Sequence, residues 1–237
     1  MIDGCYNLNE RKLKVVKTEK DLGVYFDNKL LFEEHISIII KKASSLLGMI
    51  RRSFVYLDKV IFKLLFVTIV RPHLEYAAPV WNPHLKKLIT QIENVQRRGT
   101  KLLPGMKDLT YKQRLKAIGL PTLEYRRYRG DMIELFKLTH NLYDVPDLLN
   151  LRADNCTERA STAHQYTIMK GKYTKDVRKY FFINRVADQW NNLPNKVVSS
   201  TNLNMFKNRL DKIWKINDVM YDAEVDLYQI TSLRPDI

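Results

Sequence analysis

Apolar residues recur at three- and four-residue steps along most of this chain, which is the spacing of one face of an α-helix. The pattern predicts helices over Leu30–Arg52, Lys59–Val70, Pro83–Leu103, Tyr111–Ile118 and Thr122–Tyr143. Two further helices are expected near the C-terminus, one after Asn184 and one after Ser200 or Thr201. The segment Lys59–Val70 is apolar on nearly all sides, so we expect it to be central and buried.

Short polar side chains stand where these helices are expected to begin. The candidate N-caps are Asp27 or Asn28, Asp58, Asn82, Thr110 and Thr122. Pro83 follows Asn82 at the first helical position, where a missing N–H is tolerated. Gln113 completes a capping box with Thr110, and Gly119 stands where a left-handed residue ends that helix. Pro72 and Pro79 predict bends in the apolar run before Asn82.

Short segments rich in β-branched and aromatic residues predict strands at both ends of the chain. The expected strands are Cys5–Leu8, Leu13–Val16 and Gly23–Phe26, and then Tyr166–Met169 and Arg178–Phe182. The fold class is therefore mainly α. We expect a helical bundle with a small N-terminal β appendage of three strands and a smaller α+β part at the C-terminus.

The composition suggests five parts along the chain. We expect strands over residues 1–28, a helical domain over 29–144, a polar linker or excursion over 145–174, a C-terminal helical part over 175–216 and an acidic tail over 217–237. The tail carries a net charge of −4, which leaves +18 on the rest of the chain.

The net charge of +14 narrows the class of partner. A surface this positive attracts polyanions. Basic residues clearly outnumber acidic ones between His84 and Lys137, where there are thirteen Lys or Arg and five Asp or Glu. We expect no membrane partner, because no apolar stretch approaches the roughly 20 residues of a membrane span. Cys5 and Cys156 are expected to be reduced thiols, and the expected location is the cytoplasm or nucleus.

Basic residues interleaved with aromatic ones are the candidate nucleic-acid contacts, because guanidinium groups bind phosphates and rings stack on bases. The candidates are Arg97, Arg98, Lys101, Tyr125, Arg126, Arg127 and Arg129. We expect their five arginines to converge on one groove. The alternative is that Tyr128 packs inward while its neighbouring arginines are solvated or paired with Glu124 and Asp131. For Arg97, Arg98 and Lys101 the alternative is compensation of the helix dipole.

Motifs for catalysis and cofactor binding are missing from the sequence. There is no phosphate-binding glycine loop, no zinc-protease motif and no adjacent pair of aspartates. The five histidines never stand three or four residues apart, which excludes a two-histidine metal site on one helix. We therefore expect no cofactor.

Several long segments carry a resemblance to a known family. They are EKDLGVYFDNKLLFEEHI, VRPHLEYAAPVWNP, IENVQRRGTKLL, YKQRLKAIGLPTLEYRRYRGDMIELFKL, FFINRVADQWNNLPNKVV and NLNMFKNRLDKIW. Together they span Glu19 to Trp214 and resemble the region that follows the polymerase palm in reverse transcriptases of non-LTR retrotransposons of the jockey and chicken-repeat type.

The resemblance implies a thumb-like helical domain, preceded by the last strands of a palm, from a transposable element. Its implied work is to grip RNA or an RNA–DNA hybrid through the backbone, without sequence specificity. The Asp-Asp motif that holds the catalytic metals in an RNA-directed DNA polymerase is missing here, so no activity is expected from this chain alone. A second polymerase chain carrying the palm is a possible partner. The rival hypothesis is a helical interaction module, or an inert remnant, with no nucleic-acid role.

Overall fold

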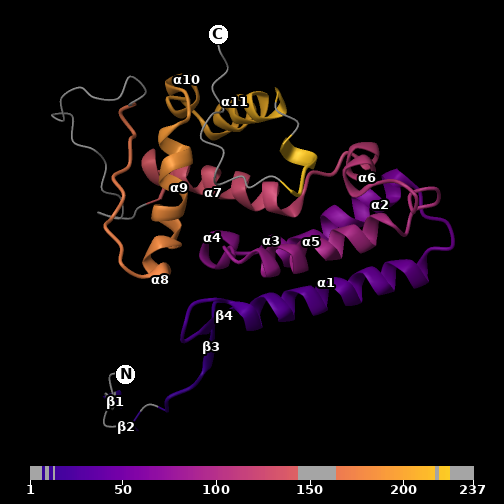
Figure 1. Ribbon diagram of the computed structural model, residues 1–237, viewed down its shortest axis with the longest axis horizontal. Helices are drawn as coiled ribbons and strands as arrows, with labels where there is room; N and C mark the ends of the chain where they lie inside the picture. Colours follow the sequence, from indigo (N-terminus) through magenta and orange to yellow (C-terminus); the bar gives the residue numbers. More distant parts are fainter. Residues whose placement is uncertain (1–6, 9–10, 13, 144–163, 217–218, 225–237) are drawn as a thin grey trace.

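The computed structural model describes residues 7–8, 11–12, 14–143, 164–216 and 219–224, and these residues are mainly helical, as predicted (Figure 1). The helices are α1 (Glu33–Ser53), α2 (Lys59–Leu65), η1 (Phe66–Val70), α3 (Arg71–Glu75), α4 (Ala78–Trp81), α5 (Lys86–Thr100), α6 (Tyr111–Ile118), α7 (Leu123–Thr139), α8 (Asp176–Lys179), α9 (Phe182–Asn191), α10 (Asn195–Val198), α11 (Leu203–Ile216) and η2 (Val219–Tyr221).

Two antiparallel strand pairs precede the helices. β1 (Asn7–Leu8) pairs with β2 (Arg11–Lys12), and β3 (Thr18–Asp21) pairs with β4 (Val24–Asp27). The second hairpin turns at Leu22 and Gly23, both with positive φ, which is the pattern of a type I′ turn. The strand predicted at Gly23–Phe26 differs from β4 by one residue at each end. The predicted strand Leu13–Val16 is wrong, because residues 14–16 form no strand and β3 begins later.

The first long helix begins three residues later than predicted, at Glu33 rather than Leu30. The Asp27 carboxylate accepts hydrogen bonds from the backbone N–H groups of Lys29, Leu31 and Phe32, at 2.9, 3.2 and 2.6 Å. These bonds organise a turn in which Leu30 and Phe32 have positive φ. Asp27 therefore shapes the approach to α1 without capping it.

The segment predicted as one buried helix over Lys59–Val70 is two consecutive pieces, α2 and η1, and the chain continues directly into α3. Asp58 caps it as predicted, since its Oδ1 accepts from Ile61 N at 2.7 Å. Pro72 lacks the N–H that an α-helix would bond to Thr68, and the preceding π-turn opens the helix at that point. The helix is not buried all round, because Val60 is 76% exposed and Leu64 62% exposed.

The prediction that Asn82 caps the next helix, with Pro83 as its first residue, is wrong. α5 begins at Lys86, and the Asn82 side chain instead donates to Asp131 Oδ2 at 3.1 Å. The helix also ends at Thr100, three residues before Leu103.

The predicted caps of the next two helices are confirmed. Thr110 and Gln113 form a capping box at the start of α6, and Gly119 ends it with φ 70°. Thr122 Oγ1 accepts from Tyr125 N at 3.1 Å at the start of α7. This helix ends at Thr139 instead of Tyr143.

The strands predicted at Tyr166–Met169 and Arg178–Phe182 are wrong. The first segment makes a single bridge at Ile168, and the second contains the end of α8 and the start of α9. Asn184 does not cap a helix but lies within α9, where its Oδ1 accepts from Gly171 N at 3.0 Å. The last helix is capped by Asn202, whose Oδ1 accepts from Met205 N at 2.8 Å, rather than by Ser200 or Thr201. Most of the linker predicted over 145–174 lies outside the described residues.

Two hydrophobic cores meet at α7. The first is built by α1 to α6 and reaches Leu123, the first residue of α7. The second joins the rest of α7 to α9, α10 and α11. Trp81 anchors the first core, and Trp190 and Trp214 anchor the second. In Figure 1, α7 lies between α5 on one side and α11 on the other.

Candidate nucleic-acid interface

The seven predicted contact residues do not share one groove. Arg97, Arg98 and Lys101, at the end of α5, line a hollow of about 600 Å³. Arg126, Arg127 and Arg129 line a different hollow beside α4, α8 and α9. The prediction that the five arginines converge is therefore wrong.

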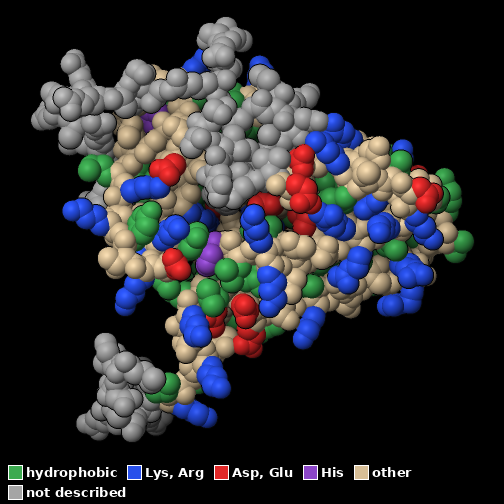
Figure 2. Space-filling view, viewed as in Figure 1, with side chains coloured by type: hydrophobic (Ala, Val, Ile, Leu, Met, Phe, Trp, Pro, Cys, Tyr) green, Lys and Arg blue, Asp and Glu red, His purple; other side chains and the backbone are tan. Residues whose placement is uncertain are grey.

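The hollow at the end of α5 is defined by its basic lining, and we call it the basic hollow. Its residues come from α1, α5, the residue after α5 and α6: Ser37, Ile40, Lys41, Gln91, Asn94, Arg97, Arg98, Lys101 and Arg114. This lining contains five cationic side chains and no carboxylate. Figure 2 shows Lys and Arg side chains spread over the α5 and α6 end of the molecule.

Arg98 connects the two long helices that form the walls of the basic hollow. Its Nη2 donates to Ser44 Oγ on α1 at 3.0 Å, and its Nε donates to Asn94 O at 3.3 Å. Lys41 and Lys101 are exposed and also line the hollow. These contacts fix the Arg98 guanidinium in the lining, to which the two exposed lysines also belong.

Tyr111 brings two further arginines to the basic hollow. The guanidinium carbon of Arg97 lies 4.5 Å from the centre of the Tyr111 ring, and that of Arg114 lies 5.6 Å away. Arg114 is buried, and its Nε donates to Thr100 Oγ1 at 3.0 Å. Burial, and then the charge of Arg97, lower the pKa of Arg114. Arg97 also forms an ion pair with the exposed Glu224 at 3.4 Å.

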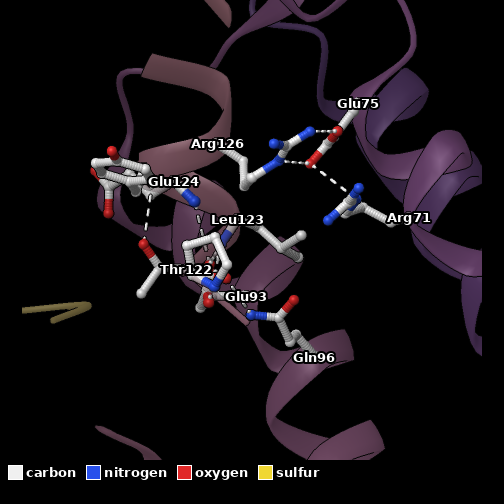
Figure 3. Close-up of polar contacts among 10 residues, drawn as sticks. Arg71, Glu75, Glu93, Gln96, Thr122, Leu123, Glu124 and Arg126 are labelled. Carbon is white, nitrogen blue, oxygen red and sulfur yellow. Dashed lines mark hydrogen bonds and ion pairs between the residues drawn. The ribbon is translucent and has the colours of Figure 1, made fainter. Parts of the chain in front are cut away.

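Glu93, which the helical pattern places on the polar face of α5, is buried against the first turn of α7 (Figure 3). Its Oε2 accepts from Leu123 N at 3.0 Å and from Glu124 N at 3.3 Å, and its Oε1 accepts from the Tyr111 hydroxyl. Burial raises the pKa of Glu93, against the lowering effect of the Tyr111 hydrogen bond. The carboxylate thereby satisfies N–H groups that begin a helix and ties it to α5.

Arg126 is held by two hydrogen bonds to one carboxylate (Figure 3). Its Nε and Nη2 donate to Glu75 Oε1 and Oε2 at 2.9 and 3.0 Å, and Arg71 approaches the same carboxylate at 3.6 Å. The Glu75 hydrogen bonds raise the pKa of Arg126. Arg129 makes the equivalent pair with Asp211 of α11, at 2.6 and 2.7 Å.

Tyr125 and Arg127 are interior residues, each 2% exposed. The Tyr125 ring meets Trp214 edge-on, with 5.6 Å between ring centres, and burial raises its pKa. Arg127 Nε donates to Asn82 Oδ1 at 3.0 Å. Tyr128 packs inward, as the alternative reading expected, but the neighbouring arginines pair with Glu75 and Asp211. The segment from Tyr125 to Arg129 therefore joins the two cores.

Comparisons with known proteins identify one distant relative. An uncharacterized protein of Caenorhabditis elegans, B0403.1, is 24% identical over 148 residues, which cover 60% of this chain and 73% of that protein. No protein-family model matches the chain. No solved structure matches it either.

Two other kinds of site, a metal site and a membrane span, are not found in the described part of the chain. Its His, Cys, Asp and Glu side chains form no group of three that would hold a metal ion. None of its helices is long and apolar enough to cross a bilayer. The basic hollow is therefore the feature on which we base a function.

Lys41 and Arg114 are the two cationic residues of the basic hollow that were not predicted from the sequence. Lys41 lies 56 residues before Arg97 in the numbering, and only the packing of α1 on α5 brings them together. Arg114 is part of the correctly predicted helix α6, but nothing in its local sequence shows which way it faces. Only the tertiary structure shows that Lys41 and Arg114 line the hollow.

Proposed function

We propose that this chain binds the backbone of RNA or an RNA–DNA hybrid through the basic hollow, without sequence specificity and without catalysis of its own. One observation carries the proposal: five cationic side chains from three parts of the fold line one hollow with no carboxylate among them. A polyanion is the ligand for such a surface, because phosphates neutralise the mutual repulsion of its cations. The resemblance to the region after a reverse-transcriptase palm supports the same class of ligand.

The proposal assigns different roles to the predicted residues. Arg97, Arg98 and Lys101 contact phosphates together with Lys41, and Arg114 adds charge from the buried wall. Arg126, Arg127, Arg129 and Tyr125 hold the two cores together instead. Placing Glu at Arg126 would set two carboxylates side by side at Glu75, so that variant is expected to lose stability before it loses affinity.

Salt dependence is the test of backbone binding. If three or four phosphates are neutralised, log K on a hybrid duplex should fall with log salt at a slope of roughly −3 to −4. Lys101→Glu should weaken binding on every sequence tested and flatten the slope by about one unit. Lys107→Glu is the matched control, since Lys107 is an exposed lysine that does not line the hollow.

Two results would contradict the proposal. One is a hybrid affinity that does not change with salt in the wild-type chain. The other is an equal loss of affinity in Lys101→Glu and Lys107→Glu, which would assign the binding to net charge rather than to the basic hollow.

An interaction module remains the rival function, and exposed apolar side chains favour it. They gather where α1 ends and α2 begins: Met49, Phe54, Val55, Tyr56, Val60 and Leu64. Exposed apolar side chains that gather on one part of a surface are typical of protein contacts. Under our proposal, replacing Val55 and Leu64 with Ser leaves binding of the RNA–DNA hybrid unchanged. The rival function instead predicts that neither the wild-type chain nor this double variant binds the hybrid in a salt-dependent way.

A further inference from the structure

Residues 219–224 follow α11 and pack on both hydrophobic cores, and we call this segment the strap. Met220 packs against the second core, whereas Tyr221 and Ala223 pack against the first. The helix η2 within the strap contacts α6, α7 and α11 (yellow in Figure 1). The strap therefore leads the chain from α11 back to the core that carries the basic hollow.

Polar contacts fix the course of the strap. Thr122 N, at the start of α7, donates to Met220 O at 2.8 Å. Lys112 Nζ of α6 donates to Asp222 Oδ2 at 2.8 Å, and this hydrogen bond lowers the pKa of Asp222. The other oxygen of Asp222 accepts from Glu224 N at 3.0 Å. The end of the strap is thereby held beside the last turn of α5, where Glu224 meets a cation of the basic hollow.

That cation is Arg97, whose Nη2 lies 3.4 Å from Glu224 Oε1. The two partners differ in exposure, since the side chain of Arg97 is 32% exposed and that of Glu224 is 86% exposed. Arg97 also lies over the Tyr111 ring, which holds the guanidinium in the lining of the hollow. The Glu224 side chain, by contrast, is mostly in solvent and can leave Arg97 without uncovering apolar surface.

We propose that Glu224 competes with nucleic acid for the basic hollow: its carboxylate pairs with Arg97 in the free chain, and a backbone phosphate displaces it on binding. This regulation rests on the function proposed above, because it concerns the same hollow. Carboxylate and phosphate are both anionic acceptors for a guanidinium, and together at Arg97 they would repel each other. A row of phosphates carries more charge than one carboxylate, so the pair weakens binding of a polyanion without preventing it.

The affinity of the full chain for a labelled RNA–DNA hybrid, measured by fluorescence anisotropy, tests this competition. Glu224→Gln removes the negative charge and keeps the length of the side chain. It should bind the hybrid about twofold to fivefold more tightly than the wild-type chain, the range expected for loss of an exposed ion pair. Asp108→Asn is the matched control, since Asp108 is an exposed acid that does not line the hollow, and it should stay close to wild type.

A double-mutant cycle with Arg97 separates release of the ion pair from a general effect of charge. Glu224→Gln should give no gain in a chain that already carries Arg97→Gln, because no pair is left to release. Equivalently, Arg97→Gln should cost more affinity in the Glu224→Gln chain than in the wild-type chain. Circular dichroism confirms the fold of each variant.

Two results would overturn the competition while the proposed function stands, provided that Lys101→Glu weakens salt-dependent binding. The first is wild-type affinity in Glu224→Gln. The second is an equal gain from Glu224→Gln with and without Arg97, or an equal gain in Asp108→Asn, which would assign the effect to net charge. Hybrid binding by the wild-type chain that does not respond to salt would instead contradict the proposed function, and the competition with it.

Discussion

Glu93 shows how one buried carboxylate organises the junction between the two cores. It accepts two backbone N–H groups from the start of α7 and the hydroxyl of Tyr111 from α6. Removing it takes the acceptor from three donors, two of them buried, so Glu93→Ala should lose about 3–5 kcal/mol of unfolding free energy. Urea unfolding measures this loss, and a loss below about 1 kcal/mol would contradict the role assigned to Glu93.

The same residue predicts a pH dependence of stability. Burial raises the pKa of Glu93 above its ordinary value of 4.5, so the folded state keeps the proton to a higher pH than the unfolded chain does. The stability that Glu93 contributes is therefore fully present below pH 4.5 and falls as the pH rises through the raised pKa. The difference in unfolding free energy between the wild-type chain and Glu93→Gln should shrink over that rise. A constant difference would contradict the raised pKa.

At the scale of elements, two glycines predict opposite effects of the same substitution. Gly130→Ala should stabilise the protein by roughly 0.5–1 kcal/mol, because the helix interior favours alanine and the added Cβ meets open space. Gly119→Ala should destabilise by about 1 kcal/mol, because Gly119 ends α6 at φ 70° and a Cβ would lie 3.0 Å from Lys63 Nζ. Thermal unfolding of both variants compares them, and shifts of the same sign would contradict this account.

Helix boundaries set by local chemistry were predictable from the sequence. The caps at Asp58, Thr110 and Thr122 are correct because each side chain bonds an N–H three residues away. Asn82 and Asn184 misled the prediction because their side chains have partners elsewhere in the fold, Asp131 and Gly171. A short polar residue before an apolar run predicts a cap only when no distant partner competes for it.

The predicted contact residues also fall into two groups, those placed together by local spacing and those bonded to residues far away in the sequence. Arg97, Arg98 and Lys101 lie within about one helical turn, so their presence in one hollow follows from local spacing. Arg126 and Arg129 are bonded to acids 51 residues before and 82 residues after them, which no local pattern reveals. Charge density in the sequence therefore indicated a basic segment but did not separate surface arginines from those that join the cores.

At the scale of the whole molecule, α7 is shared by both cores while the basic hollow belongs to the first core alone. The hollow is lined by α1, α5 and α6, and its cations gather because α1 packs against α5. We propose that this arrangement, and not the net charge of +14, binds a nucleic-acid backbone. Variants of two neighbouring lysines on α1 can distinguish binding by the basic hollow from binding by net charge.

Lys41 lines the basic hollow, whereas Lys42 is exposed on the same helix and does not line it. The most direct test is therefore the affinity of Lys41→Glu and Lys42→Glu for one RNA–DNA hybrid over a range of salt concentrations. We predict that Lys41→Glu weakens binding and flattens the slope of log K against log salt by about one unit, while Lys42→Glu stays close to wild type. Equal behaviour of the two folded variants would contradict the claim.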